Sequence, residues 1–179
     1  MSDSTNAYTA LRFNLEVSAR YHDYRRATLE ARVTLIRLVS LLGSVLSLLA
    51  VSHWVESKET MIQAVAIISA VVGLVNLVDL VFHFDADARV HTSVFQRYKA
   101  LLADMARHQG DWEKRTPEWE AEAQAIRGDE PPTYWALYAL AWNQTLEKND
   151  IHTHRRPLSW WQRLAANWKQ FRPDQFRPA

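Results

Sequence analysis

The sequence predicts an all-α membrane protein, in which cytoplasmic amphipathic helices continue a two-helix transmembrane hairpin into a helical bundle. Two apolar segments, 33–55 and 61–84, are each long enough to cross a hydrocarbon core about 30 Å thick as an α-helix. The joint between them, 56–60, reads ESKET and is too short and too polar to form a domain. Only 4 glycines and no cysteines occur among 179 residues, which favours helices without disulfides or thiolate metal sites.

A soluble bundle with two buried central helices is the alternative interpretation. Core helices usually keep a hydrated stripe, whereas no charged residue occurs on any face between Leu38 and Val51. Hydropathy therefore favours the membrane interpretation. We expect three regions: a cytoplasmic amphipathic helix over 1–32, the transmembrane hairpin over 33–84, and a cytoplasmic helical region over 85–179 with a Trp-rich basic C-terminal segment.

The cations of the chain indicate how the hairpin is oriented. Lys and Arg side chains stay on the cytoplasmic side of membrane spans. They flank the outer ends of the predicted hairpin at Arg20, Arg25, Arg26, Arg32 and Arg37, and at Arg89, Arg97 and Lys99. The joint carries one Lys and two Glu. Both termini are therefore expected in the cytoplasm and the joint outside it.

A helical seam is expected on each side of the hairpin. Apolar and aromatic side chains recur at alternating spacings of about four and three from Phe13 to Leu35, and again from Val90 to His108. Such spacing is typical of a helix that packs on another helix. The two seams can pack antiparallel on each other, face different partners within a compact bundle, or build a homo-oligomer. The pattern does not choose among these, because a heptad does not name its partner.

Two further helices are predicted before the C-terminal segment. Thr116-Pro117 suits the first turn of an acidic helix, and Gly128 suits its end. The segment 133–149 contains neither Gly nor Pro, which favours a second helix. Aromatic side chains fall on one face of this helix at Trp135, Tyr138 and Trp142.

The C-terminal segment mixes tryptophan with cations, as interfacial helices do. Indole rings prefer the headgroup level of a bilayer, and cations meet anionic lipid there. We expect an interfacial anchor formed by Trp160, Trp161, Arg163, Trp168 and Lys169. Membrane lipid is accordingly an expected partner. The alternative is that these aromatic residues cap the helical domain, since Trp also occurs in ordinary cores.

Small and polar residues form a stripe on each predicted span. On the second span the stripe consists of Ser69, Gly73, Asn76, Asp79 and His83. On the first span it consists of Ser40, Ser44 and Ser47, with Gly43 beside them. One interpretation is structural, because small residues let two helices approach closely and hydroxyls bond across them. The other is functional: stripes from several subunits face a common axis and line a water-filled path.

Arg37 and Asp79 are the ionisable residues placed deepest in the predicted hairpin. If the chain folds back near Lys58, they lie at nearly equal depth, and an intramembrane ion pair is expected. An unpaired Arg or Asp at the centre of a span costs roughly 2.5 to 3.5 kcal/mol on insertion scales. The pair is either a fixed staple between two helices or a latch that breaks on activation.

The other functional classes have little support in the sequence. The net charge of +1 gives no reason to expect a nucleic-acid partner. His83, Asp85, Asp87 and His91 cluster after the second span, but a metal centre there is not expected because such residues are common at helix ends. No Gly-rich phosphate loop, nucleophile elbow or zinc signature occurs. We therefore expect neither an enzyme nor a bound cofactor.

The layout of the chain resembles that of the SLATT family, the two-transmembrane effector domains that associate with SMODS and SLOG proteins. The resemblance rests on Arg20-Tyr21-His22 and Arg25 before the first span, and on Asn143 in a helix after the second. The two spans with a very short joint and the Trp-rich basic end also agree with it.

This resemblance implies a membrane effector of a bacterial anti-phage conflict system. Such effectors answer a nucleotide-linked signal from a sensor or synthase encoded nearby. They oligomerise and form a pore or otherwise depolarise the inner membrane, which stops the infected cell before phage are released. The residues alone also allow a non-conducting membrane anchor or assembly subunit that docks a cytoplasmic partner.

Overall fold

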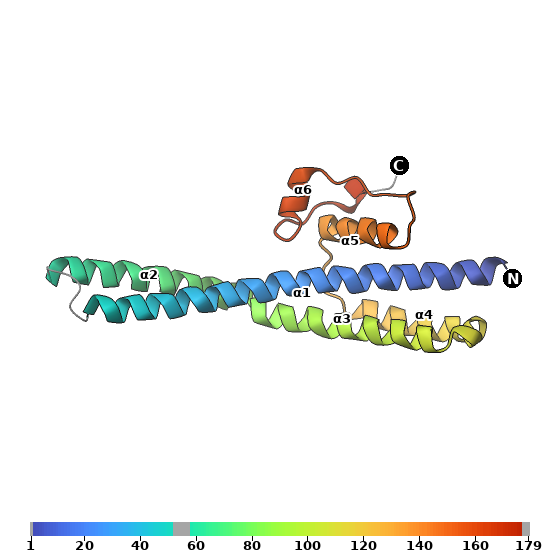
Figure 1. The fold of residues 1–179 in the computed structure, drawn as a ribbon, viewed down its shortest axis with the longest axis horizontal. Coiled ribbons are helices and arrows are strands. Elements are labelled where there is room, and N and C mark those ends of the chain that lie inside the picture. Colours follow the sequence, from blue (N-terminus) through green and yellow to red (C-terminus); the bar gives the residue numbers. More distant parts are fainter. Residues whose placement is uncertain (1, 52–57, 177–179) are drawn as a thin grey trace. The chain divides into compact units, whose positions relative to one another are not determined.

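The computed structural model describes residues 2–51 and 58–176, and within these ranges it contains helices and no strand (Figure 1). The elements in chain order are α1 (Ser2–Val51), α2 (Lys58–Phe82), α3 (Phe84–Arg107), η1 (Gln109–Asp111), α4 (Trp112–Gly128), α5 (Trp135–Lys148), α6 (Trp160–Ala165) and η2 (Pro173–Phe176). The chain divides into two compact units. The central unit is Ala27–Ala88, and the terminal unit is made of the residues up to Arg26 and from Arg89 onward.

Two helices, α1 and α2, are long and apolar enough to cross a membrane. In the central unit their apolar side chains lie on the surface. On α2 these side chains are more than half exposed at Ile62, Ile67, Val71, Leu74, Leu77, Leu80, Val81 and Phe82. A helix in the core of a soluble domain would bury such residues. The apolar surface of the central unit is therefore of the kind that hydrocarbon covers.

The ends of the apolar helices differ from the predicted spans. The first predicted span was 33–55, whereas α1 ends at Val51, and the following residues 52–57 lie outside the described part of the chain. The predicted joint, 56–60, reaches into α2, because α2 already begins at Lys58. At the other end α2 stops at Phe82 rather than continuing to Phe84.

His83 interrupts the helix between α2 and α3. Its φ of 50° lies in the left-handed region, which residues other than glycine disfavour. Backbone hydrogen bonds nevertheless continue on both sides, from His83 N–H to Asp79 O at 2.9 Å and from Asp87 N–H to His83 O at 3.1 Å. A left-handed residue among helical ones turns the chain, which explains why the span ends there although the sequence stays apolar to Phe84.

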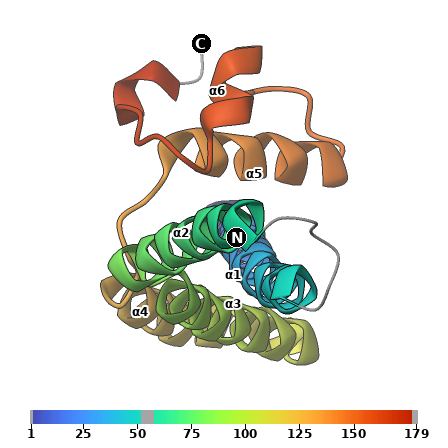
Figure 2. The ribbon, with the colours of Figure 1, turned by 90° about the vertical axis from the view of Figure 1, so that its left-hand side faces the viewer.

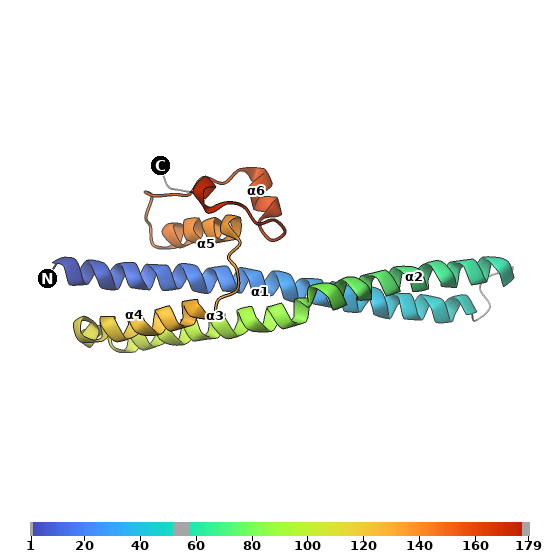
Figure 3. The ribbon, with the colours of Figure 1, turned by 180° about the vertical axis from the view of Figure 1, so that it is seen from behind.

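Within the central unit, α1 and α2 run antiparallel in contact (Figures 1 and 3). Ser40 Oγ donates a hydrogen bond to Asn76 Oδ1 at 2.9 Å. A Cβ built on Gly43 would overlap Val72 Cγ2, so the two helices approach closely because residue 43 has no side chain. The face of α2 that turns toward α1 is half-buried at Val65, Ile68, Val72, Val75 and Asp79.

In the terminal unit, α1 lies between two groups of helices (Figure 2). One face of α1 packs with α3 and α4 in a core that includes Leu11, Leu15, Ala19, Val94, Tyr98, Leu101, Met105, Trp119, Ala123 and Ile126. The other face packs with α5 and the C-terminal residues in a second core of Val17, Tyr21, Ala136, Leu137, Ala139, Ala141, Ala166 and Phe176. Both apolar faces of α1 are thereby covered.

The two predicted seams face different partners. The seam of α1 that holds Val17 and Tyr21 packs toward α5, whereas the seam of α3 that holds Val94 and Tyr98 packs toward α4 and the opposite face of α1. The first buried position of α3 is also displaced by one residue from the predicted seam. Val90 is 43% exposed, and His91 takes the buried place at 4% exposure. This displacement brings a histidine into the interior of the terminal unit.

Candidate functional site

A group of buried polar residues lies where α1, α3 and the chain after α4 meet. His22 of α1 is 0% exposed and His91 of α3 is 4% exposed. Their Nδ1 atoms are 2.8 Å apart, which is hydrogen-bonding distance. Tyr98 Oη donates a hydrogen bond of 2.5 Å to Glu130 Oε1, and the same oxygen lies 3.2 Å from His22 Nε2. We call His22, His91, Tyr98 and Glu130 the histidine cluster.

The environment sets the protonation of this cluster. Burial, followed by the positive charges of His22 and Arg25, lowers the pKa of His91 to about 3. His91 is therefore neutral at physiological pH. One of the two Nδ1 atoms donates to the other, so a single hydrogen lies between the two nitrogens.

Glu130 completes the cluster as a carboxylate. Burial alone raises its pKa, but the contacts from His22 and Tyr98 outweigh burial, and the net pKa lies below the ordinary value. Burial and then the Glu130 carboxylate raise the pKa of Tyr98, which therefore stays a protonated donor. His22 Nε2 lies within ion-pair distance of Glu130 without hydrogen-bond alignment.

Arg25 and Tyr21, on the same helix as His22, hold two more segments. The Arg25 guanidinium lies 4.0 Å from the centre of the Tyr134 ring and donates a hydrogen bond of 2.8 Å to Asn167 O. Tyr21 Oη accepts a hydrogen bond of 3.1 Å from Tyr134 N–H. One stretch of α1 therefore fixes the chain before α5 and the chain after α6.

Asn143 of α5 fixes the loop that follows its own helix. Its Nδ2 donates to Arg156 O and its Oδ1 accepts from Arg156 N–H, both at 2.8 Å. The Asn143 side-chain amide thus pairs with both backbone groups of Arg156, as a neighbouring strand would, although this segment is irregular. The Arg156 guanidinium lies 4.4 Å from the Trp142 ring centre, and burial lowers its pKa. The residues that carry the family resemblance, Tyr21, His22, Arg25 and Asn143, all act here as internal ties.

The predicted polar stripes of the central unit point in different directions. On α1, Ser40 and Ser47 are half-buried, while Ser44 is exposed and donates to Ser40 O at 2.9 Å. On α2 the exposed positions of the stripe are Ser69, Gly73 and Asn76, and His83 after the helix is exposed as well. Ser40 and Ser47 of the α1 stripe therefore lie nearer the contact face, whereas most of the α2 stripe lies about one residue, or roughly 100°, away from it.

Gly73 does not serve the close approach that a small-residue stripe suggests. A Cβ at Gly73 would meet no described atom within 4 Å. Gly43 performs this role instead, against Val72. Asp79 is the half-buried member of the α2 stripe, and its Oδ1 is shielded from solvent without a hydrogen-bond partner among the described residues. Asn76 also reaches α1, through its hydrogen bond with Ser40.

Arg37 has a different ion-pair partner from the predicted one. Its Nη2 lies 3.7 Å from Asp85 Oδ1, and no contact between Arg37 and Asp79 occurs among the described interactions. The reason is geometric, since side chains tilt toward the N-terminus of their own helix. On antiparallel helices, side chains at equal depth therefore diverge. The long Arg37 side chain reaches past the end of α2, as arginines near a membrane surface do.

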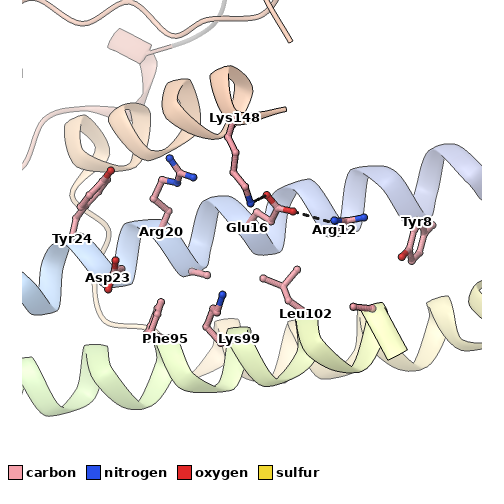
Figure 4. A pocket seen from close by; sticks show the side chains of 12 residues that line it. Tyr8, Arg12, Glu16, Arg20, Asp23, Tyr24, Phe95, Lys99, Leu102 and Lys148 are labelled. Atoms are coloured by element: carbon pink, nitrogen blue, oxygen red, sulfur yellow. Dashed lines mark hydrogen bonds and ion pairs between the residues drawn. The ribbon is translucent and has the colours of Figure 1, made fainter. Parts of the chain in front are cut away.

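A cleft of about 370 Å³ opens in the terminal unit between α1, α3 and α5 (Figure 4). Cations reach it from three helices at Arg12, Arg20, Lys99 and Lys148. Its acids are already paired: Glu16 binds Lys148 at 3.0 Å and Arg12 at 3.4 Å, and Asp23 binds Arg26 at 2.8 Å. The lining is therefore positive on balance and suits an anionic group better than a cation.

Two sets of residues remain: the predicted interfacial anchor, and the His and Asp residues after the second apolar segment, where a metal centre is not expected. Trp160, Trp161, Arg163, Trp168 and Lys169 are all exposed on the terminal unit. Among the residues that the structure describes, no group of three or more His, Cys, Asp or Glu is placed to hold a metal ion. His91, one member of the predicted acidic and histidine cluster, instead contacts His22, which is 69 residues away in sequence.

Compared with models of known protein families, with curated proteins and with solved structures, the chain matches none of them. Its resemblance to the SLATT family therefore stays a prediction. The residues that suggested it hold the terminal unit together, as the contacts of Tyr21, His22, Arg25 and Asn143 show.

Proposed function

We propose that the chain is a two-pass protein of a bacterial inner membrane with both termini in the cytoplasm. In this proposal it acts as an anti-phage effector that oligomerises, on a nucleotide-linked signal, to form a pore or depolarise the membrane. The signal comes from a sensor or synthase encoded nearby, and no catalytic step by this chain is involved. The membrane part follows the hydropathy and cation rules, and the effector part follows the family resemblance.

One observation supports this proposal most directly: the central unit exposes apolar side chains on almost every face, and a polar stripe among them. Leu48 is 71% exposed and Leu80 is 68% exposed, while Asn76 and Ser69 are exposed beside them. Hydrocarbon suits the leucines but not the amide and hydroxyl groups. Copies that turn their α2 stripes toward one axis satisfy both requirements.

Controlled expression tests the proposal. A potentiometric dye follows the membrane potential of bacteria that express the chain, alone and together with proteins encoded beside it. We expect depolarisation, and we expect Asn76→Leu to change it because that substitution removes an amide from the stripe. Ile67→Leu, at a position 65% exposed outside the stripe, is the matched control and should leave the effect unchanged. Cells that keep their potential at every expression level and with every such partner contradict the proposal.

A non-conducting anchor or assembly subunit is the second candidate. It is favoured by the hydrogen bond between Ser40 and Asn76, because part of the stripe then finds its partner within one chain. In this case the terminal unit docks a cytoplasmic partner, and the membrane potential stays intact. The candidate predicts a complex that survives Asn76→Leu, measured by affinity purification from membranes. The anchor candidate is contradicted if the wild type depolarises the membrane and Asn76→Leu loses the complex.

A further inference from the structure

The short helix α6 and the turn after it present a large apolar surface. Trp160 is 72% exposed, Trp161 is 56% exposed, Leu164 is 64% exposed and Trp168 is 71% exposed. Trp161 and Leu164 lie one turn apart on α6, the Trp160 ring centre lies 5.9 Å from that of Trp161, and Trp168 follows in the turn after the helix. By contrast, Trp119 in the same unit is only 1% exposed, so the core of the terminal unit does accommodate a tryptophan. We call Trp160, Trp161, Leu164 and Trp168 the tryptophan face.

The tryptophan face is held in place by the structure beneath it. Ser159 and Gln162 form a capping box at the start of α6, with Gln162 N–H donating to Ser159 Oγ at 3.2 Å and Ser159 N–H donating to Gln162 Oε1 at 2.9 Å. Ala166 is 1% exposed within the core, and Arg25 binds the backbone of Asn167. The exposure is therefore a property of a fixed element, and not of a frayed end.

Positive charge surrounds this apolar surface. Between Pro157 and Phe176 the charged residues are three cations and one acid: Arg163, Lys169, Arg172 and Asp174. All four are exposed. A second copy of the same face would bring these cations together, which opposes self-association. A bilayer with anionic headgroups complements both features, because indole rings insert at the headgroup level while Arg and Lys meet phosphate.

We propose that the tryptophan face binds the headgroup region of an anionic lipid bilayer and so seats the terminal unit on the membrane surface. The cations Arg163 and Lys169 select anionic over neutral lipid, and the indoles supply the apolar contact. This docking needs no conduction by α1 and α2, and it goes beyond the proposed effector activity. It does use the proposal that the central unit brings the chain to a membrane.

A single-cysteine probe tests this docking, since the chain has no cysteine of its own. Leu164→Cys places a polarity-sensitive fluorophore on the tryptophan face of the full chain in nanodiscs. Gln124→Cys, on an exposed position of α4, is the matched control. Nanodiscs contain phosphatidylcholine with or without phosphatidylglycerol, and a doxyl-labelled lipid acts as quencher. We expect lipid quenching at residue 164, stronger with phosphatidylglycerol, and none at residue 124.

The charge variant and a span probe separate the possible outcomes. Replacing Arg163 and Lys169 by Gln should lower the ratio of docked to free terminal unit by on the order of tenfold in anionic nanodiscs. Equal quenching at 164 and 124, no dependence on phosphatidylglycerol, or a lipid-independent blue shift that indicates a protein contact would each overturn the proposal. A label at Leu48→Cys reports the span itself. Quenching at 48 without quenching at 164 overturns the docking alone, whereas no quenching at 48 overturns the proposed membrane insertion.

Discussion

His91 makes the stability of the terminal unit depend on pH. An unfolded histidine has a pKa of about 6.5, whereas burial and the charges of His22 and Arg25 lower that of His91 to about 3. Between these values the unfolded chain binds a proton that the folded chain does not. Stability is therefore complete above about pH 6.5 and falls as the pH drops below it. At about 1.36 kcal/mol per pH unit, the loss at pH 5 is up to about 2 kcal/mol.

Glu130 acts in a different pH window. The pKa of Glu130 is lowered in the folded state, so its contribution to stability is present above about pH 4.3 and is lost below it. Measurements between about pH 5 and pH 7.5 therefore report the histidine. Urea denaturation of the full chain in nanodiscs, followed by tryptophan fluorescence, gives the free energy of unfolding at each pH.

A variant isolates the contribution of the buried ring. In His91→Asn the side-chain amide can still accept or donate the hydrogen bond with His22, but the side chain no longer titrates. We expect a flatter dependence of stability on pH than in the wild type. His152→Asn, which removes a 75% exposed histidine, should keep the wild-type dependence. A wild-type stability that does not change between pH 5 and pH 7.5, or one that changes equally in His91→Asn, would refute the assignment of His91 as a buried neutral histidine.

Three other substitutions test the internal contacts of the two units. Gly43→Leu should separate α1 from α2 at a cost of about 1 to 3 kcal/mol, because a Cβ there already overlaps Val72 Cγ2, while Gly73→Ala should be tolerated. Cysteine crosslinking across the pair measures this contact, and equal effects of the two variants would contradict it. His83→Gly should raise the free energy of unfolding by up to about 1 kcal/mol, since a φ of 50° suits glycine. A fall in the midpoint of thermal unfolding would show that the histidine side chain is needed. Asn143→Ala should cost about 1 to 3 kcal/mol, because two backbone hydrogen bonds at 2.8 Å lose their partner, and limited proteolysis after α5 should detect the freed loop.

The helical class and the two apolar helices could be predicted from the sequence, because length and hydropathy are local properties. The contact face of α2 could not. In a soluble helix the polar stripe marks the face away from the core, but in an apolar helix a polar stripe can face a neighbouring helix or a water-filled path, so it does not identify the contact face. The contact face through Ile68, Val72 and Val75 is chosen by the space over Gly43, which lies on the other helix.

The histidine cluster shows the same limit for polar residues. His22 and His91 each looked like a surface or motif residue, and nothing near either in sequence points to the other. Their contact depends on α3 packing against α1 in a register that turns His91 inward in place of Val90. One signal was available: a histidine three residues before Val94 continues the alternating spacing of the buried face as well as Val90 does.

The exposed members of the α2 stripe support the proposed assembly. Stripe residues turned toward α1 can be satisfied within one chain, as Asn76 is by Ser40. Ser69 instead lies on the exposed side of α2, among side chains as apolar as Leu74, which is 63% exposed. In hydrocarbon a polar group without a partner is costly, and a serine hydroxyl can find a partner in the carbonyl oxygen one turn earlier, in water or in another copy. Water and another copy are available together where several copies meet, which is how the placement of this stripe supports the proposed oligomer.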